Sequence, residues 1–257
     1  MAKAPVRKQN NRTFIGLLVL VGVVGVGALG YVLTRPGEKA LTVDPSIPAG
    51  TAEGYLLGRP DAPVQVMEFG DFECPGCGNF ANVTEPDVRA RLVNTGIVAF
   101  RFFDFPLSAH RNSWTAHVAA SCAADQGKFW EMHDRIYAGQ NEWGLTGSGE
   151  VTTNPIKVFR KYATEIGLDV KKWEDCLAAK PHEARIKANA AEGMRRQING
   201  TPTFIIGNKM LPSDHVTGYD EFKRYVDEAL AAATKSDSGK KATRTAPPRK
   251  GGAPEEK

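Results

Sequence analysis

The stretch EFGDFECPGCGNF, residues 68–80, sets Cys74 and Cys77 on either side of Pro75 and Gly76. The chain has four cysteines in 257 residues, enough length for a sizeable core without help from a dense disulfide network. A C-x-x-C pair by itself is compatible with a zinc clamp, a structural disulfide or a reactive thiol pair. The surrounding sequence therefore has to decide between these three interpretations.

Apolar runs on both sides of this stretch predict the strands of an α/β frame. APVQVMEF, 62–69, is a short run bounded by prolines, and IVAFRFFDF, 97–105, is β-branched and aromatic. Strand character returns at TFIIG, 203–207, and then at KMLPS, 209–213. An amphipathic helix is predicted from about 219 to 233.

A helix is predicted to begin at the cysteine pair, because a proline in the first helical turn costs no hydrogen bond. Further along, Glu85-Pro86 is expected to kink or split this helix, since the residue before a proline disfavours helical backbone. The order is then strand, cysteine pair at a helix start, and strand.

From about 108 to 196 the sequence predicts successive helices, so a helical block interrupts the α/β frame. The predicted breaks between its helices are Gly127, 144–149, Gly167 and Pro181. Three histidines of the block show no metal-ligand pattern and are expected to be exposed or in the core: His110, His117 and His133. Its larger aromatic side chains are expected to be helical core, with one or two available to line a peptide groove: Trp114, Phe129, Trp130 and Trp173.

Three features in this order resemble the DsbA-like thiol:disulfide oxidoreductases of the thioredoxin superfamily. They are Glu68 six positions before the first cysteine, the Cys74-Pro75-Gly76-Cys77 motif, and Thr201-Pro202-Thr203 just before a strand. The resemblance covers about residues 55–233. It implies a thioredoxin fold of the α/β class with an inserted all-helical subdomain at about 108–196.

The chemistry of a helix start suits a reactive pair. Only a thiolate attacks a disulfide, and unpaired N–H groups and the positive dipole end at a helix N-terminus lower a thiol pKa. Cys74 is therefore predicted to be the nucleophile, and Cys77, one turn inside, to resolve the mixed disulfide. A zinc site would need further ligands at suitable spacing, which favours the reactive pair over the metal clamp. A purely structural 74–77 disulfide is the other alternative.

The resemblance also implies roles for residues around the pair. Glu68 corresponds to a buried acid that relays the proton of Cys77, whereas the alternative is a carboxylate exposed at a strand edge. Burial would raise its pKa toward that of a general base. Asp71 and Glu73 are expected to be solvated, and their charge opposes thiolate formation at Cys74.

The substrate-binding residues implied by the resemblance lie on two loops. Pro202 corresponds to a cis-proline whose loop faces the cysteines and leaves the backbone of Thr201 free to pair with an extended peptide; an ordinary trans proline is the alternative. Pro75 and Gly76 face the same substrate. Because this dipeptide lacks the histidine of the CPHC motif in strongly oxidising relatives, we expect a milder oxidant.

The remaining two cysteines are Cys122 and Cys176, both in stretches predicted to be helical. Four cysteines allow three pairings, and a 74–77 pair leaves these two for each other. An exported protein would keep such a disulfide, and similar second disulfides occur in some relatives of the family. Two buried free thiols are the alternative.

The N-terminal part of the chain predicts a membrane anchor. Residues 14–33 are twenty positions without a charge, about the length that spans a bilayer. Residues 1–13 are predicted to stay in the cytoplasm, because they carry no acid and four basic residues: Lys3, Arg7, Lys8 and Arg12. A cleaved signal peptide ending near Ala28-Leu29-Gly30 is the alternative, giving a secreted or periplasmic protein. Residues 34–54, with several prolines, are predicted to be a linker.

The net charge of +4 comes from the ends of the chain, so it does not indicate nucleic-acid binding. Residues 234–257 are rich in Lys, Pro, Gly and Ser and are predicted to be a disordered basic tail. No G-x-x-x-G pattern occurs in 14–33, and we expect a monomer.

The leading functional hypothesis is an envelope thiol oxidase, anchored in the cell membrane, that donates its Cys74–Cys77 disulfide to reduced exported proteins as they fold. This redox-active disulfide is its only expected cofactor, and no metal is expected. The resemblance implies re-oxidation by a quinone-linked membrane partner of the DsbB or VKOR type. The alternatives are a disulfide reductase or isomerase, as in cytochrome c maturation, and a non-catalytic thioredoxin-fold binding module.

Overall fold

The computed structural model describes residues 20–22, 24–25, 46–144, 154–212, 215–216 and 218–245, with side chains of the last helix described up to 235. Residues 1–40 form one unit and 41–257 another. In the first unit the described residues are helical. The predicted anchor at 14–33 otherwise lies outside the described residues, as does the linker up to 45. Within the described part of the chain, no helix combines the length and apolar character needed to cross a membrane.

The core of the second unit is a mixed five-stranded sheet in the order β1-β3-β2-β4-β5. The parallel pair β2 and β3 occupies its centre, and antiparallel strands flank it on both sides. The strands are β1 (Tyr55–Leu57), β2 (Val64–Gly70), β3 (Val98–Asp104), β4 (Thr203–Ile206) and β5 (Lys209–Pro212). The four predicted strands are confirmed, whereas the short edge strand β1 carried no sequence signal strong enough to predict it.

A helical run follows β2 and begins at the cysteine pair as predicted. It consists of α2 (Pro75–Asn79), the π-helical turn η1 (Phe80–Thr84), α3 (Glu85–Val88) and a second π-helical turn η2 (Arg89–Val93). Pro86 lies in the first turn of α3, so the run is divided there without losing helical backbone. The wide turn η1 closes with the Glu85 N–H donating to the Phe80 carbonyl, which accommodates the proline.

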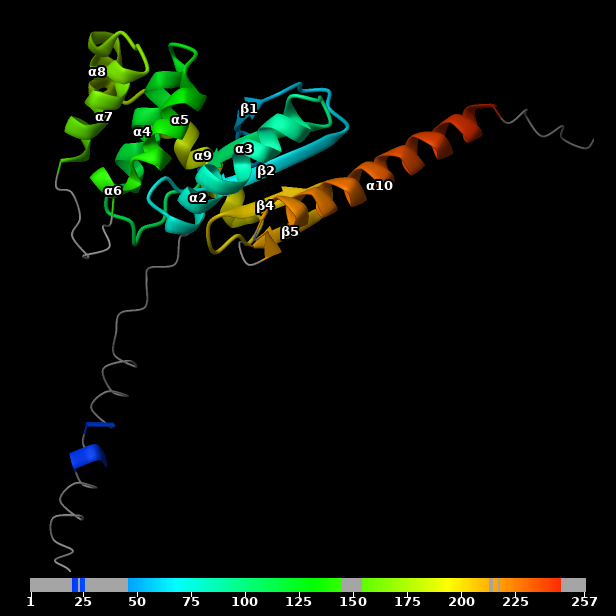
Figure 1. Ribbon diagram of the computed structural model, residues 1–257, viewed down its shortest axis with the longest axis horizontal. Coiled ribbons are helices and arrows are strands. Elements are labelled where there is room, and N and C mark those ends of the chain that lie inside the picture. The colour runs from blue at the N-terminus through cyan, green and yellow to red at the C-terminus, as the bar shows by residue number, and fades with distance from the viewer. Residues whose placement is uncertain are drawn as a thin grey trace, which may run out of the picture. The chain divides into compact units, whose positions relative to one another are not determined.

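The predicted helical block stands between β3 and β4, and Figure 1 shows α4, α5, α7 and α8 grouped together beside the sheet. Its helices are α4 (Ser113–Ala124), α5 (Phe129–Ala138), α6 (Gln140–Trp143), α7 (Pro155–Glu165), α8 (Val170–Ala179) and α9 (Glu183–Arg195). Helices α4 and α8 are joined by a disulfide between Cys122 and Cys176, with a Cα–Cα distance of 5.8 Å. The predicted pairing of these two cysteines is confirmed.

Buried apolar side chains cover both faces of the sheet. On one face Val66, Phe100 and Phe204 pack against the helical run after β2 and against α10 (Tyr219–Thr245). On the other face Phe69 and other aromatic side chains pack against α9. The helical block has its own cluster, which extends to both active-site cysteines. The cysteine pair therefore lies where the sheet and the helical block meet.

The C-terminal helix is longer than the sequence predicted. Helix α10 continues to Thr245, so residues 234–245 of the predicted disordered tail are helical; the remaining tail lies outside the described residues. The reason is that adding residues to an existing helix avoids the cost of nucleation, and this segment contains no proline before 247.

Candidate active site

Cys74 is the N-cap residue of α2, and Cys77 lies one turn inside the helix. Both are unpaired thiols; Cys74 is 8% exposed and Cys77 is fully buried. The Cys74 N–H donates to the Asp71 carbonyl at 3.0 Å, and the Asp71 N–H donates to Cys77 Sγ at 3.4 Å. The tight loop before the helix thus orients both sulfurs, with only Cys74 reachable from solvent.

The environment makes the two thiols chemically unequal. The hydrogen bond from the Cys77 thiol is the main cause that lowers the pKa of Cys74 to about 6. Burial opposes this shift, and the backbone N–H groups of Cys77 and Gly76 add to it. Burial raises the pKa of Cys77 well above its ordinary value, and the neighbouring Cys74 sulfur adds to this effect. At neutral pH Cys74 is therefore a thiolate and Cys77 a protonated thiol, as the prediction of nucleophile and resolving residue requires.

The loop before β4 faces the cysteines. The Thr201–Pro202 peptide bond is cis, as predicted, and the Cys74 thiol lies 3.2 Å from the Thr201 carbonyl oxygen. A Cβ at Gly76 would lie 3.3 Å from Pro202 Cδ, so the second residue of the CPGC dipeptide touches the cis-proline. Three of the four residues predicted to contact substrate therefore meet next to Cys74, namely Thr201, Pro202 and Gly76, and Pro75 follows Cys74 in the chain and is exposed. Their role in substrate binding stays a prediction.

Glu68 is buried near the end of β2, with 1% of its surface exposed, which excludes the alternative of an exposed strand-edge carboxylate. Burial raises its pKa well above the ordinary value, and the charge of Glu85 raises it further. Its charge in turn raises the pKa of Cys77, so the two groups lie within reach of each other's field. This electrostatic coupling is compatible with a proton relay between Glu68 and Cys77, and the relay role stays a prediction.

The expectation that Asp71 and Glu73 are solvated is wrong, because both are buried. Asp71 Oδ1 accepts from the Ser113 hydroxyl at 2.6 Å, and Asp71 Oδ2 lies 2.8 Å from His110 Nδ1. The Glu73 carboxylate accepts from the Asn112 N–H at 2.6 Å. The loop between β3 and α4, together with the first residue of α4, supplies these hydrogen-bond partners, and no local sequence pattern predicts this contact between distant segments.

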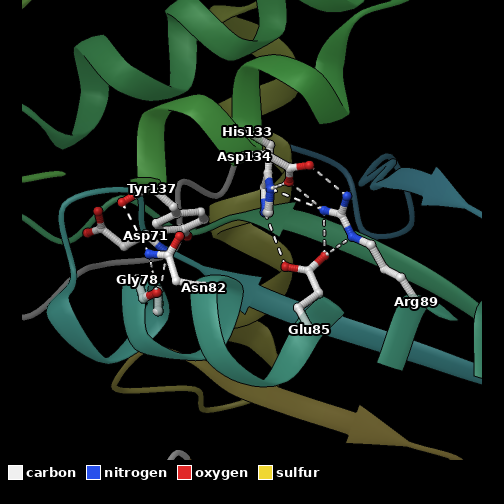
Figure 2. Close-up of polar contacts among 9 residues, drawn as sticks. Asp71, Gly78, Asn82, Glu85, Arg89, His133, Asp134 and Tyr137 are labelled. Atoms are coloured by element: carbon white, nitrogen blue, oxygen red, sulfur yellow. Dashed lines mark hydrogen bonds and ion pairs between the residues drawn. The ribbon is translucent and has the colours of Figure 1, made fainter. Parts of the chain in front are cut away.

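Two functional neighbours from the helical block were missed by sequence reasoning. The Gln140 amide donates to the carbonyls of Phe72 and Cys74, at 2.8 and 2.9 Å, and so fixes the loop that carries the nucleophile. The Tyr137 hydroxyl is buried, and the charges of Cys77 and Glu68 add to the effect of burial in raising its pKa. Figure 2 shows Tyr137 and Asn82 side by side, and the Asn82 amide donates to the carbonyls of Gly78 and Tyr137.

The family model described as Thioredoxin matches residues 51–228. The chain belongs to the thioredoxin family. The match spans the whole sheet, the cysteine pair, the cis-proline loop and the helical block, in agreement with the resemblance stated from the three motifs.

Individual members of the thioredoxin family resemble this chain over most of its length. Disulfide bond formation protein D of Bacillus subtilis is 25% identical over 198 residues, which cover 77% of this chain and 84% of that protein. The crystal structure of oxidised BdbD from Bacillus subtilis superposes with a TM-score of 0.60 at 23% identity, covering 69% of this chain and 93% of the other. Thiol-disulfide oxidoreductases are thus among the relatives of this member of the thioredoxin family.

A second group of relatives is larger than this chain. The Na(+)/H(+) antiporter NhaA 3 of Salinispora tropica is 32% identical over 233 residues, which cover 85% of this chain and 32% of the antiporter. The chain thus spans about a third of the length of the curated relatives that head the comparison.

The side chains with metal-ligand spacing in the described part of the chain are Cys122, Cys176 and His182. The sulfurs of Cys122 and Cys176 are bonded to each other in the disulfide. They lie in the helical block, on different elements from Cys74 and Cys77.

Proposed function

We propose that this protein is a thiol:disulfide oxidoreductase that oxidises thiols of exported proteins as they fold. The observation that carries the proposal is the pairing of an accessible Cys74 of lowered pKa with a buried, protonated Cys77 beside a cis-proline. A non-catalytic binding module would not require two cysteines whose thiol pKa values differ in this way. The relatives named for disulfide bond formation support the same reaction class.

The reaction follows from the geometry of the pair. A substrate thiolate attacks Cys74 Sγ of the oxidised protein, the Cys74–Cys77 bond breaks, and Cys77 leaves as a thiolate that takes a proton from Glu68. A second substrate thiolate then attacks the substrate sulfur of the mixed disulfide and releases the Cys74 thiolate, which is the better leaving group because of its lowered pKa. The substrate dithiol loses two electrons and the cysteine pair gains them.

The site of action is part of the same proposal. The charge-free segment 14–33 after a basic start supports a membrane anchor with the catalytic domain outside the cytoplasm, and a cleaved signal peptide is the alternative. Export supplies the oxidising surroundings in which the Cys122–Cys176 disulfide persists. Turnover then requires an electron acceptor, for which a quinone-linked membrane protein of the DsbB or VKOR type is our candidate.

Oxidative refolding of reduced, unfolded ribonuclease tests the activity. We expect the oxidised protein to restore ribonuclease activity faster than glutathione buffer alone, and Cys74→Ser to be inactive. The matched control is the Cys122→Ala/Cys176→Ala variant, which keeps the active-site pair and is expected to retain the activity. Equal refolding with the wild type and with Cys74→Ser would refute the proposal.

A reductase or isomerase is the second candidate, and one observation favours it. Asp71 is buried next to the cysteine loop. Although burial opposes it, the hydrogen bonds from His110 and Ser113 lower the pKa of Asp71 and keep it ionised near Cys74. A negative charge there destabilises the thiolate and moves the pair toward more reducing potentials. The potential measured in glutathione buffer separates the candidates: a value near −270 mV, the approximate figure for thioredoxin, favours the reductase.

A further inference from the structure

A group of buried polar atoms behind the cysteine pair lacks hydrogen-bond partners. Eight buried side-chain atoms of the described residues have no hydrogen-bond partner. Besides Glu73 Oε1, Thr201 Oγ1, His117 Nε2 and Arg195 Nη2, they are the four of this group: Glu68 Oε2, Glu85 Oε2, His133 Nε2 and the Tyr137 hydroxyl. All four side chains are at most 1% exposed. Buried polar atoms are bonded in the great majority of cases, so such a concentration beside one site points to a purpose other than stability.

Two of these atoms, on Glu85 and His133, belong to a chain of groups that ends at the surface with Asp134 (Figure 2). Glu85 Oε2 on α3 faces His133 Nε2 on α5 at 3.9 Å. The other ring nitrogen, His133 Nδ1, lies 2.8 Å from Asp134 Oδ1, and the Asp134 side chain is 52% exposed. The imidazole thus stands between a carboxylate buried in the interior and a carboxylate in contact with solvent.

Glu85 also acts electrostatically on Glu68 of the active site. Its charge is the second cause, after burial, of the raised pKa of Glu68, so the two carboxyls lie in one electrostatic environment. Arg89 bridges the chain on its outer side, bonding Glu85 Oε1 at 2.9 Å and Asp134 Oδ2 at 2.8 Å. Because Arg89 uses Oε1, the second oxygen of Glu85 remains available to carry a proton.

We infer that Glu85 and His133 are positioning residues that carry protons between Glu68 and solvent at Asp134. The inference rests on the proposed function, in which Glu68 must gain or lose a proton each time Cys77 changes its bonding. Glu68 itself is buried, and its Oε2 has no hydrogen-bond partner among the residues that the structure describes. A path through the protein lets it re-equilibrate while bound substrate covers Cys74.

The proton balance of the resolving step is as follows. Cys77 gives its proton to the Glu68 carboxylate, and the resulting thiolate attacks Cys74 Sγ, so the Cys74–substrate bond breaks and the substrate leaves as a thiolate. Glu68 passes the proton to Glu85, which passes it to His133 Nε2. The ring releases the proton on Nδ1 to Asp134 and from there to water, and a return of the tautomer resets the path.

Charged and titratable groups surround the path, and Arg89 Nη2 lies 3.4 Å from His133 Nδ1. Arg89 on η2 balances the carboxylates of Glu85 and Asp134, and the Arg89 guanidinium lies 4.9 Å from the Trp130 ring centroid, which shields this side. Tyr137 on α5 packs with its ring against His133 at 4.9 Å, and its own raised pKa keeps the hydroxyl neutral. Toward the active-site loop, the charges that act on Tyr137 are those of Cys77, Glu68, Asp71 and Cys74.

The test measures resolution of a mixed disulfide by stopped flow. The protein, joined through Cys74 to a fluorescent cysteine peptide, releases the peptide when Cys77 attacks. We expect His133→Gln and Glu85→Gln each to slow this release about a hundredfold at pH 7, the lower end of a general acid–base contribution, and to change the pH–rate profile. Asp134→Asn lies at the surface, does not endanger folding, and is expected to slow release as well.

A matched control is His117→Gln. His117 is as buried as His133 and its Nδ1 lies 2.7 Å from Asp104, but Asp104 is fully buried, so this pair leads to no exposed group. We expect its release rate and pH profile to match the wild type. The double variant Glu68→Gln/His133→Gln is expected to be no slower than Glu68→Gln alone, because groups on one path are not additive.

The outcomes separate the two proposals. If wild-type protein neither forms nor resolves the mixed disulfide, the proposed function fails. If the wild type resolves it and Asp134→Asn and every folded variant of Glu85 and His133 keep the wild-type rate and pH profile, the proton path is refuted. If the double variant is slowed by the product of the two single effects, the proton path is also contradicted, because such additivity indicates independent structural damage.

Discussion

The clearest perturbation of the redox properties is Gly76→His, which introduces an imidazole into the dipeptide between the cysteines. A Cβ at this position would lie 3.7 Å from Cys74 Sγ and 3.3 Å from Pro202 Cδ, so the ring has room only if the cis-proline loop yields by a few tenths of an ångström. From that Cβ the imidazolium reaches within about 5 to 6 Å of the thiolate. At an effective dielectric constant of about 20 the attraction is about 3 kcal/mol.

Partial solvation of the ring reduces this figure, so we expect about 1.5 to 3 kcal/mol, or about one to two pKa units. The pKa of Cys74, about 6 in the native site, would then fall toward 4 or 5. Since stabilising the thiolate stabilises the reduced form, the potential should become more oxidising by about 30 to 60 mV. The gain should shrink as the pH rises through the imidazole pKa and the ring loses its charge.

Two measurements check this result: equilibration with glutathione buffers, and pH titration of thiolate absorbance near 240 nm. Gly76→Ala is the control, because it adds the same Cβ against Pro202 without the charge, and it should leave the potential within about 10 mV of the wild type. A potential for Gly76→His that is unchanged or more reducing, with a normally folded protein, would refute the electrostatic reasoning.

The remaining predictions concern the other residues of the pair, the buried acid and the second disulfide. Cys77→Ser should trap mixed disulfides with substrate on non-reducing gels, because only the resolving attack is lost, whereas Cys74→Ser should form none; equal trapping by both would contradict the assignment. The folded-state pKa of Glu68 is raised, so its contribution to stability is full below the unfolded pKa of about 4.3 and is lost as the pH rises toward the folded pKa. Glu68→Gln should therefore gain about 1.4 kcal/mol of relative stability per pH unit in that window in urea unfolding, and a pH-independent difference would exclude this reasoning. Replacing both Cys122 and Cys176 by Ala opens a loop with a sequence separation of 54 residues and should cost about 4 kcal/mol, or about 8 to 16 °C in Tm, while a loss under about 1 kcal/mol would show that the disulfide does not restrain the unfolded chain.

The sequence alone determined the frame and the reactive pair. Local patterns were sufficient for the four main strands, for the helix that begins at Pro75, and for the breaks of the helical block at Gly127, Gly167 and Pro181, because alternation, glycine and proline act on their own neighbours. The predicted break at 144–149 lies outside the described residues after 144. The resemblance to the thioredoxin superfamily added the cis bond before Pro202, and the cysteine count paired Cys122 with Cys176. Each of these features depends on a short motif or on the count of cysteines, and both can be read directly from one sequence.

Tertiary structure decided the surroundings of the other buried acids of the site. Asp71 and Glu73 look like solvated loop acids in the sequence, but the β3–α4 loop and the first residue of α4 supply hydrogen-bond donors to them, and both acids are buried. Glu85 and His133 come together from helices 48 positions apart in the numbering, and no local pattern relates them. Burial and nearby charges are set by which distant segments pack together, so the surroundings of Asp71, Glu73 and Glu85 appear only in the folded chain, whereas the resemblance had implied the burial of Glu68.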